Sequence, residues 1–340
     1  MKILVAPLNW GLGHASRCVP LVQRFLDEGH EVILGGDGES LTLLRKHFPK
    51  LRYVYLAPLN LRYSAGSRQV WAMVKAMPHI LSWAIKDHAM LKAVLREEHI
   101  DRVVSDNRFG LYSKETECIY ITHQLHIMLP KGWRWAETIA SRLHARIYMH
   151  YNKVWVPDYE DFNQSLAGEL SHIKSKIQNL KSKIEYIGPL SRFENHQSSI
   201  INHQYDVVAV LSGLEPHRTQ LEKEIITRYS NQKSKIKNLK SILIVQGLMH
   251  RPSTRIKRAN ITIVPYMADD ELAQALCGAT HIIARSGYST IMDFEALGIL
   301  AKAELIPTPG QPEQEYLAAY NSQKNAEKCL KTPYFIDKND

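Results

Sequence analysis

Short apolar runs of strand length alternate with longer segments of helical periodicity along the first half of the chain. Strands are expected at 3–6, 31–35, 53–56, 102–105, 118–122 and 153–156, and helices at 15–28, 39–47, 67–95 and 134–149. Strands that take turns with helices are typical of a parallel sheet with helices on both faces. The first half therefore predicts one α/β domain over residues 1–157.

A second alternation of the same kind begins at Tyr205. The pattern predicts strands at 206–211, 241–246, 261–264 and 280–284, and helices at 216–229, 269–276, 289–297 and 313–329. The preceding residues are largely polar, apart from a short strand and a Gly-Pro turn within 184–193. We therefore expect a linker and domain entry at 158–204, a second α/β domain at 205–312, and a C-terminal helix and tail at 313–340.

The segment 280–298 predicts a strand, a tight turn and a helix in direct succession. The turn falls at Ser286 and Gly287, where free backbone N–H groups at a helix start favour an anion such as phosphate. Asp293 is expected in the first turn of this helix, where its carboxylate would reach a ribose hydroxyl. A similar strand–loop–helix unit opens the chain, which indicates two facing α/β domains.

The composition is that of a globular protein large enough for two domains. The chain has 340 residues, of which 45% are hydrophobic and 23% charged. Its four cysteines are far apart in sequence, so reduced thiols are favoured over disulfides. The first residues do not form a signal peptide, and no apolar run is long enough to cross a bilayer. The sequence predicts a cytoplasmic protein.

The net charge of +9 is concentrated in the first half. Residues 1–157 contain 21 Lys and Arg against 13 Asp and Glu, whereas residues 158–340 contain 22 against 21. A basic half favours an anionic partner, such as membrane lipid or an acidic glycan. Nucleic acid is disfavoured because no known binding module accompanies the charge. The alternative is that the surface lysines serve only solubility.

Polar side chains follow several of the strands expected in the first half. The loop GLGHASR (11–17) would let a ligand approach the backbone at Gly11 and Gly13. His14 would lie at the carboxyl end of the sheet, where it can act as a general base on a hydroxyl. The alternative for His14 is a structural or helix-capping role.

Two further strands bring candidates to the same edge of the sheet. Asp106, followed by Asn107 and Arg108, would be the base itself or would orient His14. The alternative at Asp106 is an Asx-type turn that ends the strand. His123 and Gln124 follow the next strand and are expected on the acceptor side.

The second half offers cations, amides and an aromatic side chain at the corresponding places. Ser212 and Gly213 form a second anion cradle after a strand, to which Arg218 would add charge, and Arg192 is a candidate phosphate ligand. Tyr266 and Met267 would face a flat base, although a lone tyrosine can also be a packing residue. Glu313 and Gln314 begin a helix and would bind sugar hydroxyls; helix starts also favour such residues for their own stability.

Two segments of the first half combine apolar, aromatic and basic residues. They are the helix at 67–95, with Trp71, Met73, Met77, Ile80, Leu81, Trp83 and Ile85, and the loop at 125–135. Such segments could contact an anionic membrane surface, at the inner face of the membrane, or could be buried core. Both readings stay open at this point.

These motifs resemble the GT-B glycosyltransferases, in the group that contains the peptidoglycan N-acetylglucosaminyltransferase MurG and the plant monogalactosyldiacylglycerol synthases, with a C-terminal domain of the family 28 type. The resemblance is best over about 184–320. RSGYSTIMDFEALG is similar to the group's RSG-A-x-T-x-x-E segment, with Asp293 in place of the ribose-binding Glu. GLGHASR is similar to its GGxGGH loop. In IGPLSR and LSGLEPHR the middle residues depart from the group's motifs.

The resemblance implies two Rossmann-like domains that face each other across a cleft, the first for the acceptor and the second for the nucleotide sugar. It implies an inverting transferase that moves a hexose or N-acetylhexosamine from a UDP-sugar to a glycan or lipid-linked hydroxyl. No metal or other cofactor is expected. The expected donor-binding residues are Arg192, Ser212, Gly213, Arg218, Tyr266, Met267, Arg285, Ser286, Gly287, Asp293, Glu313 and Gln314. The expected acceptor-side residues are Gly11, Gly13, His123 and Gln124, with His14 and Asp106 as catalytic residues.

Two other functions stay open on the same scaffold. A UDP-sugar epimerase would convert the sugar nucleotide without any acceptor. A non-catalytic protein would bind the sugar nucleotide or a glycan without turnover.

Overall fold

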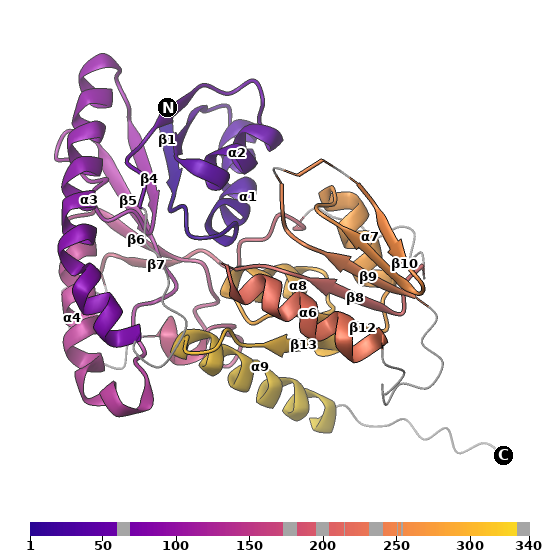
Figure 1. The fold of residues 1–340 in the computed structure, drawn as a ribbon. Helices are drawn as coiled ribbons and strands as arrows, with labels where there is room; N and C mark the ends of the chain where they lie inside the picture. The colour runs from indigo at the N-terminus through magenta and orange to yellow at the C-terminus, as the bar shows by residue number, and fades with distance from the viewer. Residues whose placement is uncertain are drawn as a thin grey trace.

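The computed structural model describes residues 1–59, 69–172, 182–194, 204–213, 215–230, 241–249, 251–252 and 254–331. Two sheets lie in separate lobes, with helices packed on them (Figure 1). Residues 173–181 and 195–203 of the expected linker and residues 332–340 of the expected tail fall outside the described residues, as does the expected start of a helix at 67–68.

The first sheet has seven parallel strands in the order β3-β2-β1-β4-β5-β6-β7. The strands are β1 (Lys2–Pro7), β2 (Glu31–Gly36), β3 (Tyr53–Tyr55), β4 (Arg102–Asp106), β5 (Glu117–Ile121), β6 (Lys153–Val156) and β7 (Ile184–Tyr186). The helices are α1 (Gly13–Asp27), α2 (Gly38–His47), α3 (Gln69–Glu97) and α4 (Glu137–Tyr148). The alternation predicted from the sequence is confirmed. Strand β7 extends the sheet past residue 157, into the range expected to be linker.

The second sheet has six strands in the order β10-β11-β9-β8-β12-β13. The strands are β8 (Val207–Val210), β9 (Ile242–Val245), β10 (Ile256–Arg258), β11 (Ile261–Val264), β12 (His281–Arg285) and β13 (Ala303–Ile306). The helices are α6 (His217–Ser230), α7 (Asp269–Gly278), α8 (Tyr288–Ala296) and α9 (Pro312–Lys331). The pattern did not predict β10 and β13. Strand β10 is exposed and antiparallel, and β13 is half-buried, so neither shows the buried apolar run of a central strand.

Both sheets reverse their strand order beside the first strand of their domain. In the first sheet β1 lies between β2 and β4, and in the second β8 lies between β9 and β12. Ligands of open α/β sheets bind at this switch point, outside the carboxyl ends of the strands. Strands β1, β4 and β5 end level with one another, because Pro7 is paired with Asp106 and Asp106 with Ile121.

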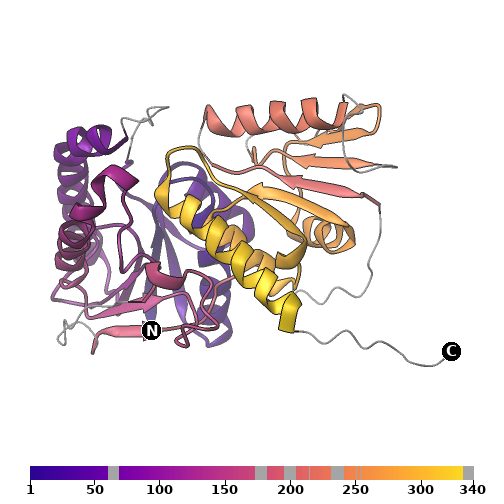
Figure 2. The ribbon, with the colours of Figure 1, turned by 90° about the horizontal axis from the view of Figure 1, so that it is seen from below.

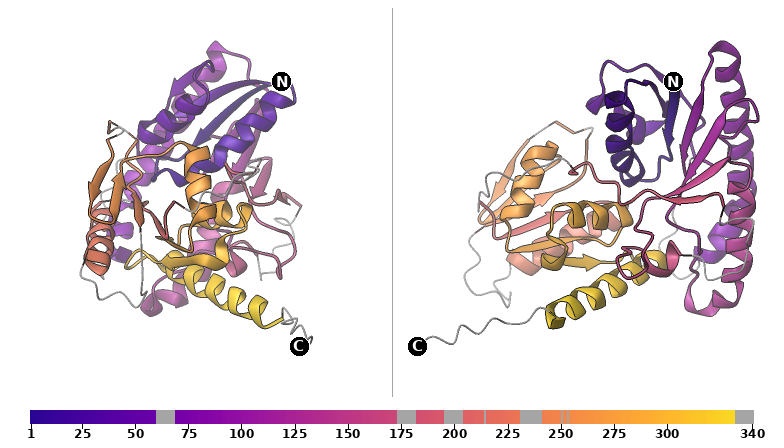
Figure 3. Two further views of the ribbon diagram at one scale, coloured as in Figure 1. Left: turned by 90° about the vertical axis from the view of Figure 1, so that its right-hand side faces the viewer. Right: turned by 180° about the vertical axis from the view of Figure 1, so that it is seen from behind.

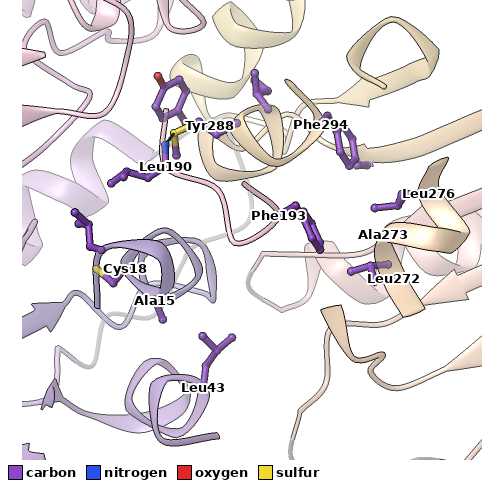
Figure 4. Packing of buried hydrophobic residues seen from close by; sticks show 14 of the residues in the cluster. Ala15, Cys18, Leu43, Leu190, Phe193, Leu272, Ala273, Leu276, Tyr288 and Phe294 are labelled. Carbon is purple, nitrogen blue, oxygen red and sulfur yellow. Dashed lines mark hydrogen bonds between the residues drawn. The ribbon is translucent and has the colours of Figure 1, made fainter. Parts of the chain in front are cut away.

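The apolar core is continuous between the two lobes. Ala15 and Cys18 of α1 belong to the same buried cluster as Tyr288 of α8, together with Leu190 and Phe193 of the connecting segment (Figure 4). Burial of this apolar surface stabilises the contact between the domains.

Helix α9 returns from the second domain to the segment that follows β6. It runs along the lower side of both lobes (Figure 2). The Tyr316 hydroxyl accepts a hydrogen bond from the Glu169 amide at 2.9 Å, and Asn321 donates to the Leu166 carbonyl at 3.1 Å. The view from behind also shows α9 crossing toward the first lobe (Figure 3). The C-terminal helix therefore fastens one domain to the other.

Candidate active site

The amino ends of α1 and α8 meet where the two domains face each other. Ser289 Oγ, in the first turn of α8, donates a hydrogen bond to the carbonyl of Gly13 at 2.9 Å. Neither helix has a side-chain cap or an acidic residue in its first turn. Unpaired N–H groups and the positive dipole ends of both helices therefore point into one place, which favours an anion between them.

His14 and Asp106 come together at the first switch point, as the sequence predicted for the edge of this sheet. His14 Nδ1 lies 2.9 Å from Asp106 Oδ1, and the Asp106 side chain is fully buried. Burial would raise the pKa of Asp106, but Arg17 and His14 outweigh it and hold that pKa well below its usual range. A carboxylate that stays ionised and has no access to solvent is suited to orient His14 and not to remove a proton itself.

Arg17 is the partner of Asp106 that sequence reasoning missed. Its Nε donates to Asp106 Oδ2 at 2.6 Å, and a terminal nitrogen donates to Oδ1. Arg17 lies one helical turn after His14, so both side chains share one face of α1. The spacing of His14 and Arg17 was the signal available in the sequence. Their carboxylate partner, Asp106, belongs to β4, which is far away along the chain.

A second set of contacts crosses from β5 of the first domain to α9. His123 Nε2 lies 2.7 Å from Glu313 Oε1, and the Gln124 side-chain amide donates to Glu313 Oε2. Burial would raise the pKa of Glu313, but its contact with His123 lowers it on balance. The structure therefore brings three predicted residues together, two expected on the acceptor side and one on the donor side.

Tyr288 completes this side of the site and was also missed. Its ring stacks on His123 with ring centroids 4.2 Å apart, and its hydroxyl donates to the Pro157 carbonyl at 2.6 Å. Burial lowers the pKa of His123. Tyr288 stands within the RSGYST motif, but an aromatic residue in a buried helix gives no sign in the sequence that it faces another domain.

Asp293 and Arg192 lie together, below the surface of the second domain. Asp293 belongs to the second turn of α8 and not to the first, as had been expected. Its carboxylate accepts a hydrogen bond from Ser191 Oγ at 2.7 Å, and Arg192 lies 3.5 Å from it and 3.0 Å from Asp269. Burial raises the pKa of Asp293 to about 6. Arg192 is therefore paired with two carboxyl groups.

Several other expected donor residues make contacts within the second domain. Arg218 pairs with Glu215 and Glu222. Arg285 donates to the carbonyls of Pro307 and His217. The Ser286 hydroxyl donates to the Gln314 carbonyl at 2.8 Å, and the Gln314 side chain accepts from the Thr308 amide at 2.8 Å. A ligand that used these side chains would have to replace such bonds, whereas the amides at Gly287 remain at an uncapped helix start.

The residues expected at the base follow β11, and those expected at the second cradle follow β8. The Tyr266 ring lies under Lys46 of α2, with the Lys46 ammonium 4.2 Å from the ring centroid. Met267 is buried and borders a cavity of about 200 Å³. Gly213 has a φ of +94° in an open loop after β8, next to the half-buried Ser212. Gly11 has a φ of +72°, which lets its loop turn into α1.

Arg108 does not reach the edge of the sheet beside Asp106. Its side chain is fully buried and pairs with Asp37 and Asp87 at 2.8 Å each. It also donates to the carbonyl of Ala57 at 2.6 Å. Asn107, with a φ of +56°, turns the chain and accepts a bond from the Tyr120 hydroxyl. Arg108 is a structural residue of the first domain.

No protein-family model matches the chain. A curated relative, described as an uncharacterized glycosyltransferase of Methanosarcina acetivorans, is 23% identical over 347 residues, which cover 97% of this chain and 86% of the relative. The solved glycotransferase of kitacinnamycin has a TM-score of 0.54 at 13% identity, over 97% of this chain and 91% of that one. UGT89C1 of Arabidopsis thaliana, complexed with UDP-L-rhamnose, has a TM-score of 0.54 at 14% identity, over 97% and 92%.

The fold is that of the GT-B glycosyltransferases, with two Rossmann-like domains, as the sequence predicted. Among the described residues, no helix has both the length and the apolar character needed to cross a membrane. The described His, Cys, Asp and Glu side chains form no group of three that could hold a metal ion.

Proposed function

We propose that this protein is a glycosyltransferase that moves a sugar from a UDP-sugar to a hydroxyl group, with inversion at the anomeric carbon. The carrying observation is the position of the His14–Asp106 pair beside the converging amino ends of α1 and α8. A base for the acceptor and a cradle for a departing diphosphate are the two parts that such a transfer needs.

His14 has the role of general base in this proposal. With the Nδ1 proton donated to Asp106 in a hydrogen bond, Nε2 has a free lone pair for the proton of the acceptor hydroxyl. The acceptor oxygen forms its bond to the anomeric carbon as the bond from that carbon to the diphosphate oxygen breaks. The proton passes to His14, and the electron pair leaves with UDP. Attack opposite to the leaving group inverts the anomeric centre.

The leaving diphosphate would be stabilised by the protein itself. The uncapped start of α8 at Gly287, the start of α1 at Gly13 and the Arg192 guanidinium provide positive charge and N–H donors. The proposed independence from a metal ion rests on these two helix starts and on Arg192. Asp293 would bind the ribose, and Tyr266 the base. Glu313 and Gln314 would bind the sugar. Uridine is supported by the motif resemblance and by the UDP-L-rhamnose named for the similar Arabidopsis structure.

The acceptor is proposed to be a glycan or a lipid-linked hydroxyl, as for the MurG and monogalactosyldiacylglycerol synthase group. Met77, Leu81 and Ile85 are exposed on one face of α3, whereas Ile80 and Trp83 of the same helix are core. On α4 and the turn before it, Trp135, Ile139 and Leu143 are exposed at the same spacing.

Exposed basic residues accompany these apolar stripes. They are Lys75, Lys86, Lys92, Lys131, Arg134, Arg142 and Arg146. Helices α3 and α4 run along the same outer side of the first domain (Figures 1 and 3). Apolar side chains among cations fit peripheral contact with an anionic membrane surface.

The donor class is tested by thermal shift with UDP, ADP, GDP and TDP. Stabilisation by UDP above the others is expected, reaching about 2.7 kcal/mol at a hundredfold excess over Kd. An equal response to all four would contradict a uridine donor.

The reaction is tested by mass spectrometry with UDP-glucose, UDP-galactose and UDP-N-acetylglucosamine, with and without lipid and glycan acceptors. A transferase forms a glycosylated acceptor and UDP. A new sugar nucleotide without acceptor would instead identify an epimerase, and UDP binding without any product would identify a binding protein. Replacement His14→Ala is expected to lower turnover by two to four powers of ten, roughly the contribution of a general base. His99→Ala, at a highly exposed histidine, is the control.

A further inference from the structure

Arg17 contacts three different groups of the candidate site at once. Its Nε and one terminal nitrogen fork onto the two Asp106 oxygens. That terminal nitrogen also lies 2.9 Å from His14 Nδ1, and the other lies 3.3 Å from His123 Nδ1. The Arg17 side chain is 1% exposed, so water cannot replace these partners. A buried guanidinium used in this way is part of the site and not a surface charge.

The contact with Arg17 fixes the tautomer of His123. Arginine nitrogens can only donate, so His123 Nδ1 has to accept, and its ring proton is on Nε2. Nε2 then donates to Glu313. His123 is thus a neutral bridge from Arg17 to the second domain, which agrees with the lowering of its pKa by burial.

His14 Nδ1 lies between an acceptor and a donor. In one arrangement it donates to Asp106, which leaves Nε2 free to accept a proton. In the other it accepts from Arg17, which puts the ring proton on Nε2 and removes the base. In the first arrangement each of the three Arg17 side-chain nitrogens still has an acceptor, either an Asp106 oxygen or His123 Nδ1.

The charged groups around His14 also indicate a role for Arg17. Asp106 of β4 and Glu313 of α9 carry negative charge, Arg17 of α1 carries positive charge, and His123 is neutral; Cys18 and Tyr288 also lie nearby. A carboxylate alone beside an imidazole stabilises the protonated ring, which is no longer a base. The guanidinium on the same carboxylate offsets that effect.

We propose that Arg17 is a positioning residue for the base: it holds Asp106 in the orientation that directs the His14 Nδ1 proton, and its positive charge offsets the negative charge of Asp106 beside the imidazole. This rests on the proposed function, in which His14 accepts the acceptor proton. Arg17 is in this proposal a third member of the group, of which the sequence predicted only His14 and Asp106.

The test is the pH dependence of kcat/KM for Arg17→Met, Arg17→Lys, Asp106→Asn and the double variant Arg17→Met/Asp106→Asn. In Arg17→Met the acidic limb of the profile should move to higher pH by about one unit or more, the effect expected for a neighbouring charge. Arg17→Lys keeps a cation, so its limb should stay near the original position at a lower rate. Asp106→Asn should move the limb to lower pH, and the double variant should return it.

A purely structural role for Arg17 would lower the rate at every pH and leave the limb in place, and that result would overturn the proposal. If Arg17→Met does not fold, the comparison of Asp106→Asn with the double variant decides the same question. Both of these variants have asparagine at position 106, so neither leaves a buried carboxylate there without its cation.

A second readout does not depend on turnover. In protein labelled with 13C-histidine, the His14 ring resonance, assigned with His14→Gln, is titrated in each variant. Its midpoint should rise in Arg17→Met and return in the double variant. An unchanged midpoint would refute the role of Arg17, even if transfer is observed. A shifted midpoint without any transfer would support the role of Arg17 in the pair and refute the proposed function.

Discussion

His123 and Glu313 lie on different domains, with Nε2 and Oε1 2.7 Å apart. The Gln124 side-chain amide donates a hydrogen bond to the other carboxylate oxygen of Glu313. Both carboxylate oxygens of Glu313, the side chain proposed to bind the donor sugar, are therefore hydrogen-bonded to the first domain. A donor sugar has to exchange its hydroxyls for these two contacts, so sugar binding and the fit between the domains depend on the same carboxylate.

Replacement Glu313→Gln tests that dependence. The KM for the UDP-sugar should rise, because bonds to an ionised group contribute about 1.5–3 kcal/mol and neutral ones about 0.5–1.5. The Kd for UDP should not change, since UDP has no sugar to contact position 313. Isothermal titration with UDP and initial rates with the UDP-sugar separate the two effects. Glu315→Gln, exposed on the same helix, is the control. An equal loss for UDP would show that Glu313 acts on the nucleotide or on the fold.

Replacement of Gly13 tests the proposed diphosphate-binding site between the starts of α1 and α8. A Cβ at this position would lie 3.0 Å from Ser289 Oγ, closer than ordinary contact, at the place where α1 and α8 meet. Gly13→Ala should therefore weaken UDP binding about tenfold, equivalent to about 1.4 kcal/mol. The helix itself should not lose stability, since alanine is the better helix former.

The double variant Gly13→Ala/Ser289→Ala serves as the matched control for that loss. It removes the Oγ atom that the new methyl group approaches, so part of the affinity should return. Affinity for UDP is measured by titration calorimetry and stability by urea unfolding. Unchanged UDP affinity in Gly13→Ala would place the diphosphate elsewhere.

Arg108 provides a prediction about stability. It is fully buried between Asp37 and Asp87, so Arg108→Met would leave two buried carboxyl groups without their cation. The free energy of unfolding should fall by about 3–5 kcal/mol. At the start of β4, Arg102 pairs with Glu117 near the surface at 2.7 Å, and Arg102→Met should cost at most about 1 kcal/mol. Urea unfolding of both variants makes the comparison, and equal losses would show that Arg108 is not the structural centre inferred here.

Local patterns in the sequence were sufficient for the fold and for one part of the site. Strand ends and glycine loops are encoded within a few residues, so the strand–loop–helix units around His14 and Gly287 could be predicted. The meeting of His14 and Asp106 followed from the rule that parallel strands end at one edge of the sheet. The second alternation of strands and helices, from Tyr205, predicted a second domain in the same way, and the resemblance added the expected roles of the two domains.

Contacts between distant segments could not be read in the same way. Arg17 and Glu313 find their partners on other strands and in another domain, and no pattern along the chain records such a pairing. Arg192 and Arg218 were expected to supply charge to a phosphate, but Asp269, Asp293 and Glu215 are paired with them. The sequence shows which residues can carry charge, whereas the fold decides which of those charges are already paired.

His144 gives the protein a predicted sensitivity to acid. Burial lowers the pKa of His144 to about 4, from an ordinary value of 6.5. The unfolded chain therefore binds a proton that the folded chain refuses between these two values. Stability should be full above pH 6.5 and should fall as the pH drops toward 4, by up to about 3 kcal/mol for this residue. The lowered pKa of His123 acts in the same direction.

Replacement His144→Gln should make the free energy of unfolding less dependent on pH in that window. A glutamine can still donate to the Gln124 carbonyl and contact the Tyr120 hydroxyl, the two hydrogen-bond partners of His144, so the loss at pH 8 should be small. Urea unfolding between pH 8 and pH 4.5 measures the slope, with His99→Gln at an exposed histidine as the control. If the curves of His144→Gln and the original protein stay parallel over this range, His144 is not the residue that couples folding to protonation.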